Sequence, residues 1–550
     1  MPTTVADVVG RTLAGLGVGH CFGVVGSGNF RVTNALRAGG VGFTATRHEA
    51  GAATMADAYA RMSGEVCLLS VHQGCGLTNA ATGICEAAKS RTPLVVLAAE
   101  AAGAAVTSNF AMDQPGFARS VGAVAERVHS GRTAVADTVR AYRTARNDRR
   151  TVVLNLPLDV QAAEVPGDAD RVPSPVPRPA PVRPAADAVA ALAALFERAR
   201  RPVIVAGRGA RGAGSQLRRL GTATGSLLAT SAVAHGLFHG EPYALGISGG
   251  FASPTAADLI SHADLIVGFG CALNMWTMRQ GRLIADDATV AQVDLDDAAL
   301  GAHRPVDLGV VGDCGSVADE VLAYLAGRGS AREGYRTAAV ADAIARRGRW
   351  NDEPTDDLST GDRIDPRTLS RELDVLLPAE RIVAIDSGNF MGYPSAYLGV
   401  PDQYGFCFTQ AFQSIGLGLS TAIGAALARP DRLPVVASGD GGFLMSVAEL
   451  ETAVRLGLPL LCVIYNDAMY GAEVHHFGAE ADLGAVTFPD TDIAALATGF
   501  GTDGLTVRRT TDLAGVTRWL ESSPTCPLVV DAKITSDGGS WWLAEAFKGH

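Results

Sequence analysis

Lysine is nearly absent from this 550-residue chain, where it occurs only as Lys89, Lys533 and Lys548. Enzymes that work through a lysine Schiff base, including those that use pyridoxal phosphate, need a lysine in the active site. Phosphate-binding loops of the Walker type need a lysine that follows a glycine. The scarcity of lysine therefore speaks against both kinds of site.

A surplus of positive charge is also missing, because 57 acidic residues outnumber 46 Lys and Arg and give a formal net charge of −11. Nucleic-acid and acidic-membrane partners require a basic face. No apolar run approaches the roughly 18 residues of a membrane span, and the N-terminal MPTTVADVVG lacks the basic and apolar regions of a signal peptide. We expect no nucleic-acid partner, no membrane partner and a cytoplasmic location.

The cysteines lack the spacing of a metal or redox motif. All nine are single, and none forms a Cys-x-x-Cys pair, so neither a structural zinc site nor a thioredoxin-type motif is predicted. An odd number of cysteines in a chain without a signal peptide fits a reducing compartment.

Two polar segments divide the chain. Residues 166–185 carry seven prolines, which favour an extended linker, and residues 348–365 are acidic and rich in turn formers. We predict domains at 1–165, 186–347 and 366–550. In each of them short apolar runs alternate with longer amphipathic segments, which is typical of a parallel sheet covered by helices on both faces. The predicted fold class is α/β, with three doubly wound parallel-sheet domains.

A Gly-x-Gly-x-x-Gly pattern follows one predicted strand of the middle domain, at Gly207, Gly209 and Gly212. A dinucleotide site would also need an acidic residue about 20 residues further on, to bind the ribose. The segment at 225–236, GSLLATSAVAHG, contains none. We interpret the glycines as a tight turn between a strand and a helix.

Two predicted strands of the C-terminal domain each end in an acid, Asp440 in the segment GDGG and Asp467 in the segment ND. A helix is predicted between them, over about 446–456. A strand-helix-strand unit brings both strand ends to the same edge of a sheet. Two carboxylates and a glycine-rich backbone suit Mg²⁺ holding a diphosphate. Either acid alone could simply cap a turn, and it is the pair at this spacing that favours the metal.

This arrangement resembles the signature of thiamine-diphosphate-dependent enzymes, in which GDG is followed at this spacing by a strand ending in NN or ND. The resemblance implies that Asp440, Asp467 and the Met469 carbonyl bind Mg²⁺. The family more often has asparagine at the position of Asp467. By the same resemblance the three domains are pyrimidine-binding, middle Rossmann-like and diphosphate-binding.

The N-terminal domain contains a second matching element. Residues 41–64 read VGFTATRHEAGAATMADAYARMSG, and Glu49 falls where the family has its catalytic glutamate, hydrogen-bonded to the aminopyrimidine ring. An isolated Glu at a helix start more often only complements the helix dipole. The conjunction with the Asp440–Asp467 unit favours the catalytic interpretation.

Further matches extend the implied site. Gln114 corresponds to a glutamine that many relatives direct at the reacting carbon. Ile415 would bend the cofactor, although a plain core role would also suit an isoleucine. Cofactor contacts are implied for Gly74, Asn79, Gly388, Asn389, Gln413, Ser414, Ile415, Gly439, Gly441, Gly442, Tyr470 and Gly471.

The order of the domains resembles the group of acetolactate synthases, pyruvate oxidases and decarboxylases. This implies a small-molecule 2-oxo acid substrate and a homodimer or homotetramer with active sites at the subunit interface. Decarboxylation followed by carboligation is the leading interpretation. A decarboxylase that releases an aldehyde is the alternative, because Glu473 matches the proton donor of decarboxylases and His476 could assist it.

Two further interpretations rank behind these. Oxidation with FAD as a second cofactor is third, because residues 268–282 lack the arginine-rich segment that helps synthases hold FAD. A paralogue that binds the cofactor without catalysis is the last, and the presence of Glu49, Asp440 and Asp467 argues against it.

Overall fold

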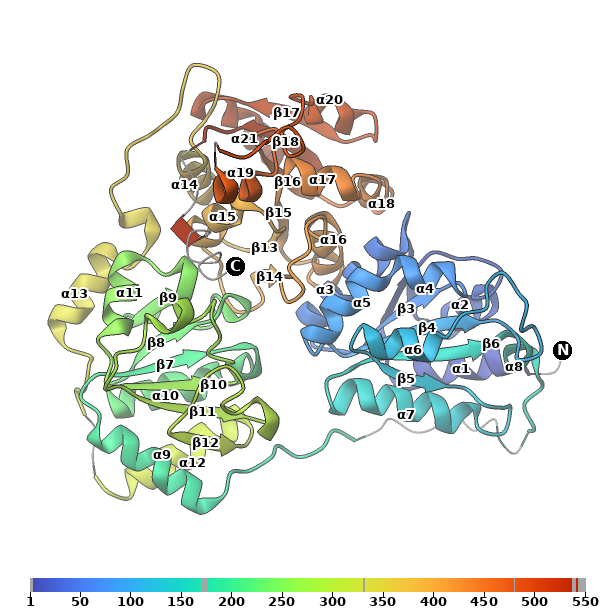
Figure 1. Ribbon diagram of the computed structural model, residues 1–550, viewed down its shortest axis with the longest axis horizontal. Helices are drawn as coiled ribbons and strands as arrows, with labels where there is room; N and C mark the ends of the chain where they lie inside the picture. The colour runs from blue at the N-terminus through green and yellow to red at the C-terminus, as the bar shows by residue number, and fades with distance from the viewer. Residues whose placement is uncertain are drawn as a thin grey trace.

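The computed structural model describes residues 3–167, 169, 177–329, 332–478, 480–536 and 541–542. They form three six-stranded sheets in which every pair of neighbouring strands is parallel, with helices packed around them (Figure 1). The predicted α/β class with three doubly wound domains is confirmed. The domain limits 1–165, 186–347 and 366–550 remain predictions.

The N-terminal sheet has the strand order β2-β1-β3-β4-β6-β5. Its strands are β1 His20–Gly23, β2 Gly42–Ala45, β3 Cys67–Val71, β4 Leu94–Glu100, β5 Val124–Arg127 and β6 Thr151–Pro157. Its helices are α1 Val5–Gly15, α2 Phe30–Ala38, α3 Glu49–Ser63, α4 Cys75–Asn79, α5 Ala81–Lys89, α6 Gln114–Ser120, α7 Ala134–Asn147 and α8 Leu158–Ala162. Every residue of β3, β4 and β6 is buried, which is why these strands are apolar along their whole length.

The middle sheet has the order β12-β11-β10-β7-β8-β9. Its strands are β7 Pro202–Ala206, β8 Leu227–Thr230, β9 Ala244–Ile247, β10 Leu265–Phe269, β11 Thr289–Asp294 and β12 Leu308–Val311, and its α-helices are α9 Ala186–Arg198, α10 Gly214–Thr224, α11 Pro254–Ser261 and α12 Cys314–Ala326. Helix α13 Ala338–Arg347 follows. A Cβ on Gly207 would lie 2.2 Å from the Gly270 carbonyl oxygen, so this glycine permits backbone packing between the turns after β7 and β10.

The C-terminal sheet has the order β14-β13-β15-β16-β18-β17, which repeats the order of the N-terminal sheet strand for strand. Its strands are β13 Arg381–Ile385, β14 Phe406–Phe408, β15 Leu433–Gly439, β16 Leu461–Asn466, β17 Asp503–Val507 and β18 Leu528–Lys533. Its α-helices are α14 Pro366–Leu376, α15 Gly392–Tyr397, α16 Gly418–Ala428, α17 Asp440–Ser446, α18 Glu449–Arg455, α19 Gly471–Phe477, α20 Ile493–Thr498 and α21 Ala514–Glu521.

The N- and C-terminal domains pack directly on each other through α3, α5 and α16 (Figure 1). One apolar cluster runs through this contact, from Phe22 and Met55 in the first domain to Ile423 and Phe443 in the third. The helices approach closely, because a Cβ on Gly424 of α16 would lie 2.2 Å from the Met55 carbonyl oxygen of α3. Among the described residues, no helix is long and apolar enough to cross a membrane.

Candidate active site

Asp440 and Asp467 lie at the carboxyl ends of neighbouring strands. Strands β15 and β16 pair in parallel with Gly439 opposite Tyr465, so the residues that follow them emerge at one edge of the sheet. Asp440 is the first residue of α17, and its side chain is 7% exposed. The helical path begins six residues earlier than the expected start near 446, and it continues through Val447 and Ala448 into α18. The two glycines after Asp440 suggested a turn, but here they form the first turn of the helix.

The enclosure of these carboxyl groups changes their ionisation. Burial raises the pKa of Asp440 to about 6, and the carboxylate of Asp531 adds to the rise. Burial also raises the pKa of Asp467 to about 7, and the charge of Asp440 contributes further. The charge of Asp440 acts on Asp467 because the two carboxyl groups lie close together, and such a pair gains from a cation between them.

Glycines leave room where the loops of this edge meet. A Cβ on Gly441 would lie 2.5 Å from the Tyr470 ring, and a Cβ on Gly471 would lie 2.8 Å from Asp467 Oδ2 and 3.1 Å from Asn389 Cβ. The segments 388–389, 440–442 and 467–471 therefore lie close together, and their contact with a cofactor remains a prediction. A side chain at Gly441 would meet the ring of Tyr470, and one at Gly471 would meet the side chains of Asp467 and Asn389.

Asp386, which the sequence analysis did not select, connects the loops of this edge. Its buried carboxylate accepts hydrogen bonds from the backbone N–H of Ser387 at 2.8 Å and of Gly416 at 2.9 Å, and from the Ser438 hydroxyl at 2.8 Å. It thereby joins the turn after β13, the loop before α16 and the end of β15. Its position at the end of an apolar strand, like that of Asp440, was the available signal.

Two non-glycine residues of the site have a left-handed backbone. Gln413 and Ala468 both have φ of +60°, an uncommon value for residues with a side chain. Such conformations cluster at functional sites, where the surrounding structure enforces them. Ser414 and Ile415 follow Gln413 and are half-buried, so Ile415 is not a fully buried core residue.

The loop after β16 is fixed by main-chain hydrogen bonds on both sides of Met469. The Tyr470 N–H donates to the Val486 carbonyl, and the Phe488 N–H donates to the Ala468 carbonyl, both at 2.8 Å. Helix α19 follows, with Glu473 half-buried and His476 exposed. Glu473 is thus placed beside the Asp440–Asp467 edge on a short helix, while His476 faces outward from the same helix.

Glu49 is the first residue of α3 and is 9% exposed. Asn79 Nδ2 donates a hydrogen bond of 3.1 Å to Glu49 Oε2. A Cβ on Gly76 would lie 3.3 Å from Glu49 Oε1, so the turn of Gly74 to Gly76 also borders the carboxylate. The structure brings Glu49, Gly74 and Asn79 together at the carboxyl edge of the first sheet.

Gln114 is buried, and its side chain is engaged by the protein itself. Its Nε2 donates to the Ala99 carbonyl and to Asn155 Oδ1, and its Oε1 accepts from the Gly74 N–H at 3.1 Å. The amide therefore holds the turn at Gly74. A contact of Gln114 with the reacting carbon remains a prediction.

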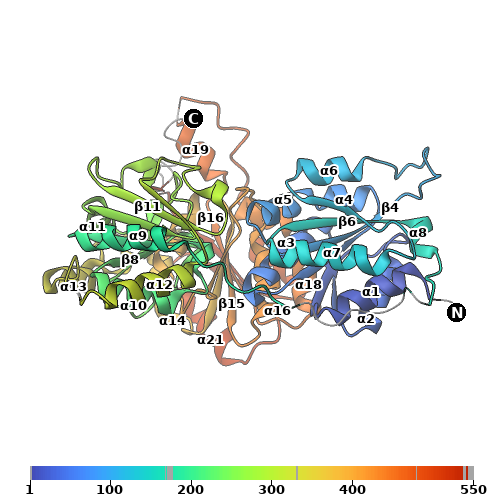
Figure 2. The same ribbon diagram turned by 90° about the horizontal axis from the view of Figure 1, so that it is seen from below.

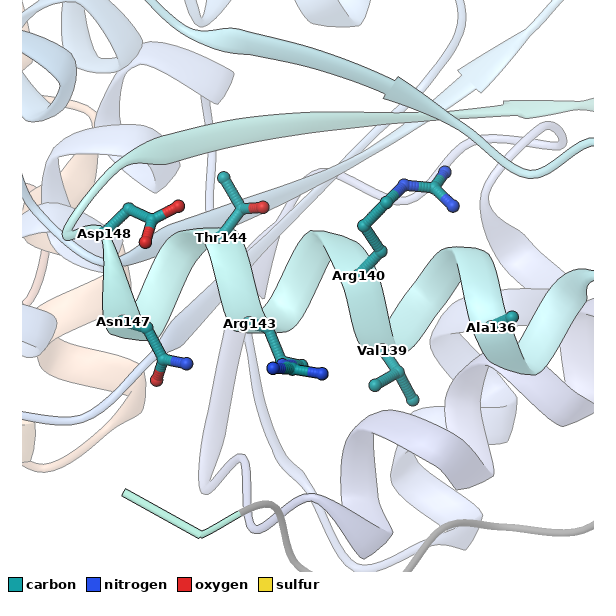
Figure 3. A pocket seen from close by; sticks show the side chains of 7 residues that line it. All are labelled: Ala136, Val139, Arg140, Arg143, Thr144, Asn147 and Asp148. Carbon is teal, nitrogen blue, oxygen red and sulfur yellow. The ribbon is translucent and has the colours of Figure 1, made fainter. Parts of the chain in front are cut away.

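Figure 2 shows where strands of the two sheets end. Helix α8, which directly follows β6, lies at the right-hand end of the N-terminal domain, whereas α19, which follows β16, stands on the upper side of the C-terminal domain. A hollow of about 340 Å³ lies elsewhere, along α7, and its lining residues, among them Arg140, Arg143 and Asp148, include none of the predicted site (Figure 3).

The side chains at the Asp440 edge fit a metal-bound diphosphate. Among the described residues, no group of three or more His, Cys, Asp and Glu is placed to hold a metal ion. A site with two carboxylates leaves coordination positions for carbonyl, phosphate and water oxygens, which suits Mg²⁺. The glycine backbone at 441–442 and 471 allows a bulky anion to approach closely.

Comparisons with known proteins agree with this geometry. Three family profiles match in chain order: "Thiamine pyrophosphate enzyme, N-terminal TPP binding domain" over 3–130, "central domain" over 189–321 and "C-terminal TPP binding domain" over 386–531. Among curated proteins, a sulfoacetaldehyde acetyltransferase of Castellaniella defragrans is 27% identical over 93% of this chain and 89% of its own length. A probable 2-ketoarginine decarboxylase of Pseudomonas aeruginosa is 29% identical, with coverage of 94% and 91%.

A probable acetolactate synthase large subunit of Methanococcus aeolicus is 26% identical over 78% of this chain and 74% of its own length. The printed names of these relatives differ in the reaction. The three family domains matched in this chain stand in the same order as its three sheets. The chain therefore belongs to the thiamine pyrophosphate enzyme family, as a thiamine pyrophosphate-dependent enzyme with N-terminal, central and C-terminal family domains.

Proposed function

We propose that this enzyme uses thiamine diphosphate and Mg²⁺ to decarboxylate a 2-oxo acid and to transfer the remaining fragment to a second carbonyl compound. The proposal depends on one observation. Asp440 and Asp467 lie at a glycine-lined edge of the C-terminal sheet, and Glu49 lies at the carboxyl edge of the N-terminal sheet. Bound thiamine diphosphate supplies the nucleophilic carbon and the electron sink for this chemistry.

Each half of the site would hold one end of the cofactor. Asp440, Asp467 and the Met469 carbonyl would bind Mg²⁺, and the backbone of Gly439, Gly441 and Gly442 would face the diphosphate. Gly388, Asn389, Tyr470 and Gly471 would complete that cradle. Glu49, oriented by its hydrogen bond from Asn79, would hold the aminopyrimidine ring.

Carboligation is supported by the acetolactate synthase among the relatives. A second candidate is decarboxylation with aldehyde release, supported by the half-buried position of Glu473 on α19, one turn from the Asp467 loop. There Glu473 would donate a proton and His476 would assist. Oxidation with FAD ranks behind both candidates, because residues 268–282 lack the arginine-rich segment.

The active unit that we propose is a homodimer, or a homotetramer built from it. Large apolar side chains are exposed beside the predicted cofactor residues, with Met445 at 59%, Phe110 at 42% and Phe412 at 44%. Phe110 packs on His72 beside the Gly74 turn, and Phe412 precedes Gln413. A cluster of exposed apolar residues around a site is typical of an interface, which a second copy would cover.

The test combines cofactor binding with product analysis. Calorimetry should show saturable binding of thiamine diphosphate that requires Mg²⁺. The loaded enzyme, supplied with pyruvate and with larger 2-oxo acids, should release CO₂ and form a 2-hydroxyketone. An aldehyde as sole product would select the second candidate, and absence of turnover with every 2-oxo acid would contradict the proposal.

A further inference from the structure

The N- and C-terminal domains are related by their topology, so their helices can be paired. The two sheets share one strand order, so their helices can be compared by their place in the chain. Helix α3 connects β2 to β3, and α16 lies in the equivalent connection from β14 to β15. Likewise α4 and α5 correspond to α17 and α18, which lie between the third and fourth strands. Of these equivalent pairs, α3 and α16 pack on each other across the interface between the domains.

Glu449, on α18 of the C-terminal domain, reaches into the N-terminal domain. Its side chain is 2% exposed, and its Oε1 accepts the backbone N–H of Arg47 at 3.1 Å and of His48 at 3.0 Å. The Thr452 hydroxyl donates to the other oxygen, Oε2, at 2.6 Å. These two N–H groups belong to the residues that immediately precede Glu49.

Glu86, on the equivalent helix α5, makes the reverse contact. Its buried carboxylate accepts the N–H of Ala411 at 3.1 Å on Oε1 and the N–H of Phe412 at 2.6 Å on Oε2. Arg61 pairs with Glu86 and also donates to the Phe408 carbonyl in the same C-terminal segment. The two N–H groups lie directly before Gln413.

The two contacts are equivalent in every topological respect. Glu86 lies on α5, between β3 and β4, and accepts two consecutive N–H groups from the loop after β14. Glu449 lies on α18, between β15 and β16, and accepts two consecutive N–H groups from the loop after β2. One loop leads into Glu49, and the other leads into Gln413, Ser414 and Ile415. Each half of the proposed site is therefore held by the domain that carries the other half.

The carboxylates of Glu86 and Glu449 are buried, and their hydrogen bonds offset the cost of that burial. Burial alone would raise the pKa of Glu86, but Arg61 and the N–H groups of Phe412 and Ala411 keep that pKa below its ordinary value. Burial raises the pKa of Glu449, and its hydrogen bonds oppose the rise. Removing a buried acceptor leaves its N–H partners unsatisfied, which costs more than the bond itself contributes.

We propose that Glu86 and Glu449 are a reciprocal pair of positioning residues, in which Glu449 fixes the backbone that presents Glu49 and Glu86 fixes the loop that presents Ile415. The inference depends on the proposed function, because it assigns both loops to the cofactor. It predicts crossed effects: a change in the C-terminal domain alters the role of Glu49, and a change in the N-terminal domain alters cofactor binding.

The crossed effects can be measured with the full chain. In Glu449→Met, which removes both acceptor oxygens, we expect the proton at C2 of bound thiamine diphosphate to exchange with deuterium about 10- to 100-fold more slowly, because Glu49 is displaced. The Kd for thiamine diphosphate with Mg²⁺ should change less than about threefold. Glu449→Gln should restore the exchange rate, because one amide oxygen can still accept both the Arg47 and His48 N–H groups.

Glu86→Gln should behave differently, because its two N–H partners use separate oxygens. We expect the Kd for thiamine diphosphate to rise about 10-fold, the size typical of lost outer-shell support. The exchange rate at C2 under saturation should stay near that of the wild type. Amide hydrogen exchange of the apo-protein should rise in residues 410–413 but not in residues 45–48.

The matched control is Glu451→Gln. Glu451 lies on the same helix as Glu449 and pairs with the side chain of Arg47 rather than with its backbone. The Glu451→Gln variant should have the wild-type Kd for thiamine diphosphate and the wild-type exchange rate at C2. If Glu449→Met does not fold, Glu449→Asp, which withdraws the oxygen by one methylene, takes its place with the same expected direction.

Equal changes of Kd and exchange rate in both variants would overturn the inference, as would wild-type values in both. Failure of the proposed function would look different, because the wild-type protein itself would then bind no thiamine diphosphate with Mg²⁺. The amide-exchange comparison of the two loops needs no cofactor and tests the positioning contacts separately.

Discussion

Asp440 and Asp467 directly follow two neighbouring parallel strands, and the charge of Asp440 raises the pKa of Asp467. Two buried carboxylates at one sheet edge destabilise the apo-protein when both are ionised. The same pair becomes favourable once a divalent cation lies between them. The electrostatics of this edge therefore favour metal binding, and they set its pH dependence.

The first prediction concerns that pH dependence. Folding raises the pKa of Asp440 to about 6 and of Asp467 to about 7, mainly through burial. The folded apo-protein then binds protons more tightly than the unfolded chain, so these groups lower its stability as pH rises from about 4 to about 7. Mg²⁺ requires both carboxylates ionised, so its affinity should increase over the upper part of that range.

Thermal unfolding with and without Mg²⁺ and thiamine diphosphate measures this effect. The increase in Tm on adding both should be clearly larger at pH 8 than at pH 6. Glu451→Gln, away from the metal edge, should reproduce the wild-type pattern. An equal increase at both pH values would contradict the assignment of these carboxylates to the metal.

The second prediction is that Asp440→Ala abolishes Mg²⁺-dependent binding of thiamine diphosphate. The substitution removes one of the two carboxylates while leaving β15 and β16 intact. Calorimetry should detect no saturable binding at cofactor concentrations that saturate the wild type. Asp482→Ala, in the exposed loop after α19, is the control and should bind normally. Undiminished affinity in Asp440→Ala would rule out its role at the metal.

The third prediction separates binding from catalysis at Glu49. Glu49→Gln keeps the size of the side chain and can still contact Asn79, but it cannot carry the negative charge. We expect cofactor affinity to stay within about threefold and turnover to fall by about 10²- to 10⁴-fold, the range typical of general acid–base groups. An unchanged kcat would remove Glu49 from the chemistry.

The sequence predicted the three parallel-sheet domains because buried strands are apolar along their whole length, as β3, β4 and β6 are. It predicted a metal site at the edge of the C-terminal sheet from the pair Asp440 and Asp467 at this spacing, because either acid alone could simply cap a turn. It did not identify Glu86 or Glu449. Each is an acid in a helix, and its burial depends on loops more than 300 residues away along the chain.

Gln114 shows the same limit. The resemblance implied a contact with the reacting carbon, which remains a prediction, and the structure adds hydrogen bonds of its amide to Ala99, Asn155 and Gly74 that the sequence did not predict. Hydrogen-bond partners of a buried side chain come from tertiary packing, which local sequence does not encode. Residue type therefore indicates the chemistry that a position could perform, and the partners decide which groups remain available.

The fourth prediction distinguishes the two candidate reactions. Glu473 is half-buried on α19 beside the Asp467 loop, where it could donate a proton in a decarboxylase. Glu473→Gln should slow aldehyde release by about 10²-fold while slowing carboligation much less. The rates of both products from one 2-oxo acid should be compared, with His476→Ala as a second variant on the exposed face of α19. Equal effects of Glu473→Gln on both products would defeat the role as proton donor.

The fifth prediction concerns the contact between α3 and α16. A Cβ on Gly424 would lie 2.2 Å from the Met55 carbonyl oxygen and 2.8 Å from its Cα, and no side-chain rotation can relieve a clash with backbone. Gly424→Ala should therefore lower the free energy of unfolding by about 1–3 kcal/mol. It should also reduce turnover, because α3 begins with Glu49.

Gly327→Ala is the matched control for this contact. Gly327 lies at the end of α12 with φ of −65°, and a Cβ there would meet its nearest atom at 3.6 Å, an ordinary contact. That substitution should be neutral or slightly stabilising, since it restricts the unfolded chain. Chemical denaturation of both variants gives the comparison. If Gly424→Ala were as stable as Gly327→Ala and fully active, the close approach of α3 and α16 would not be needed to hold Glu49 in place.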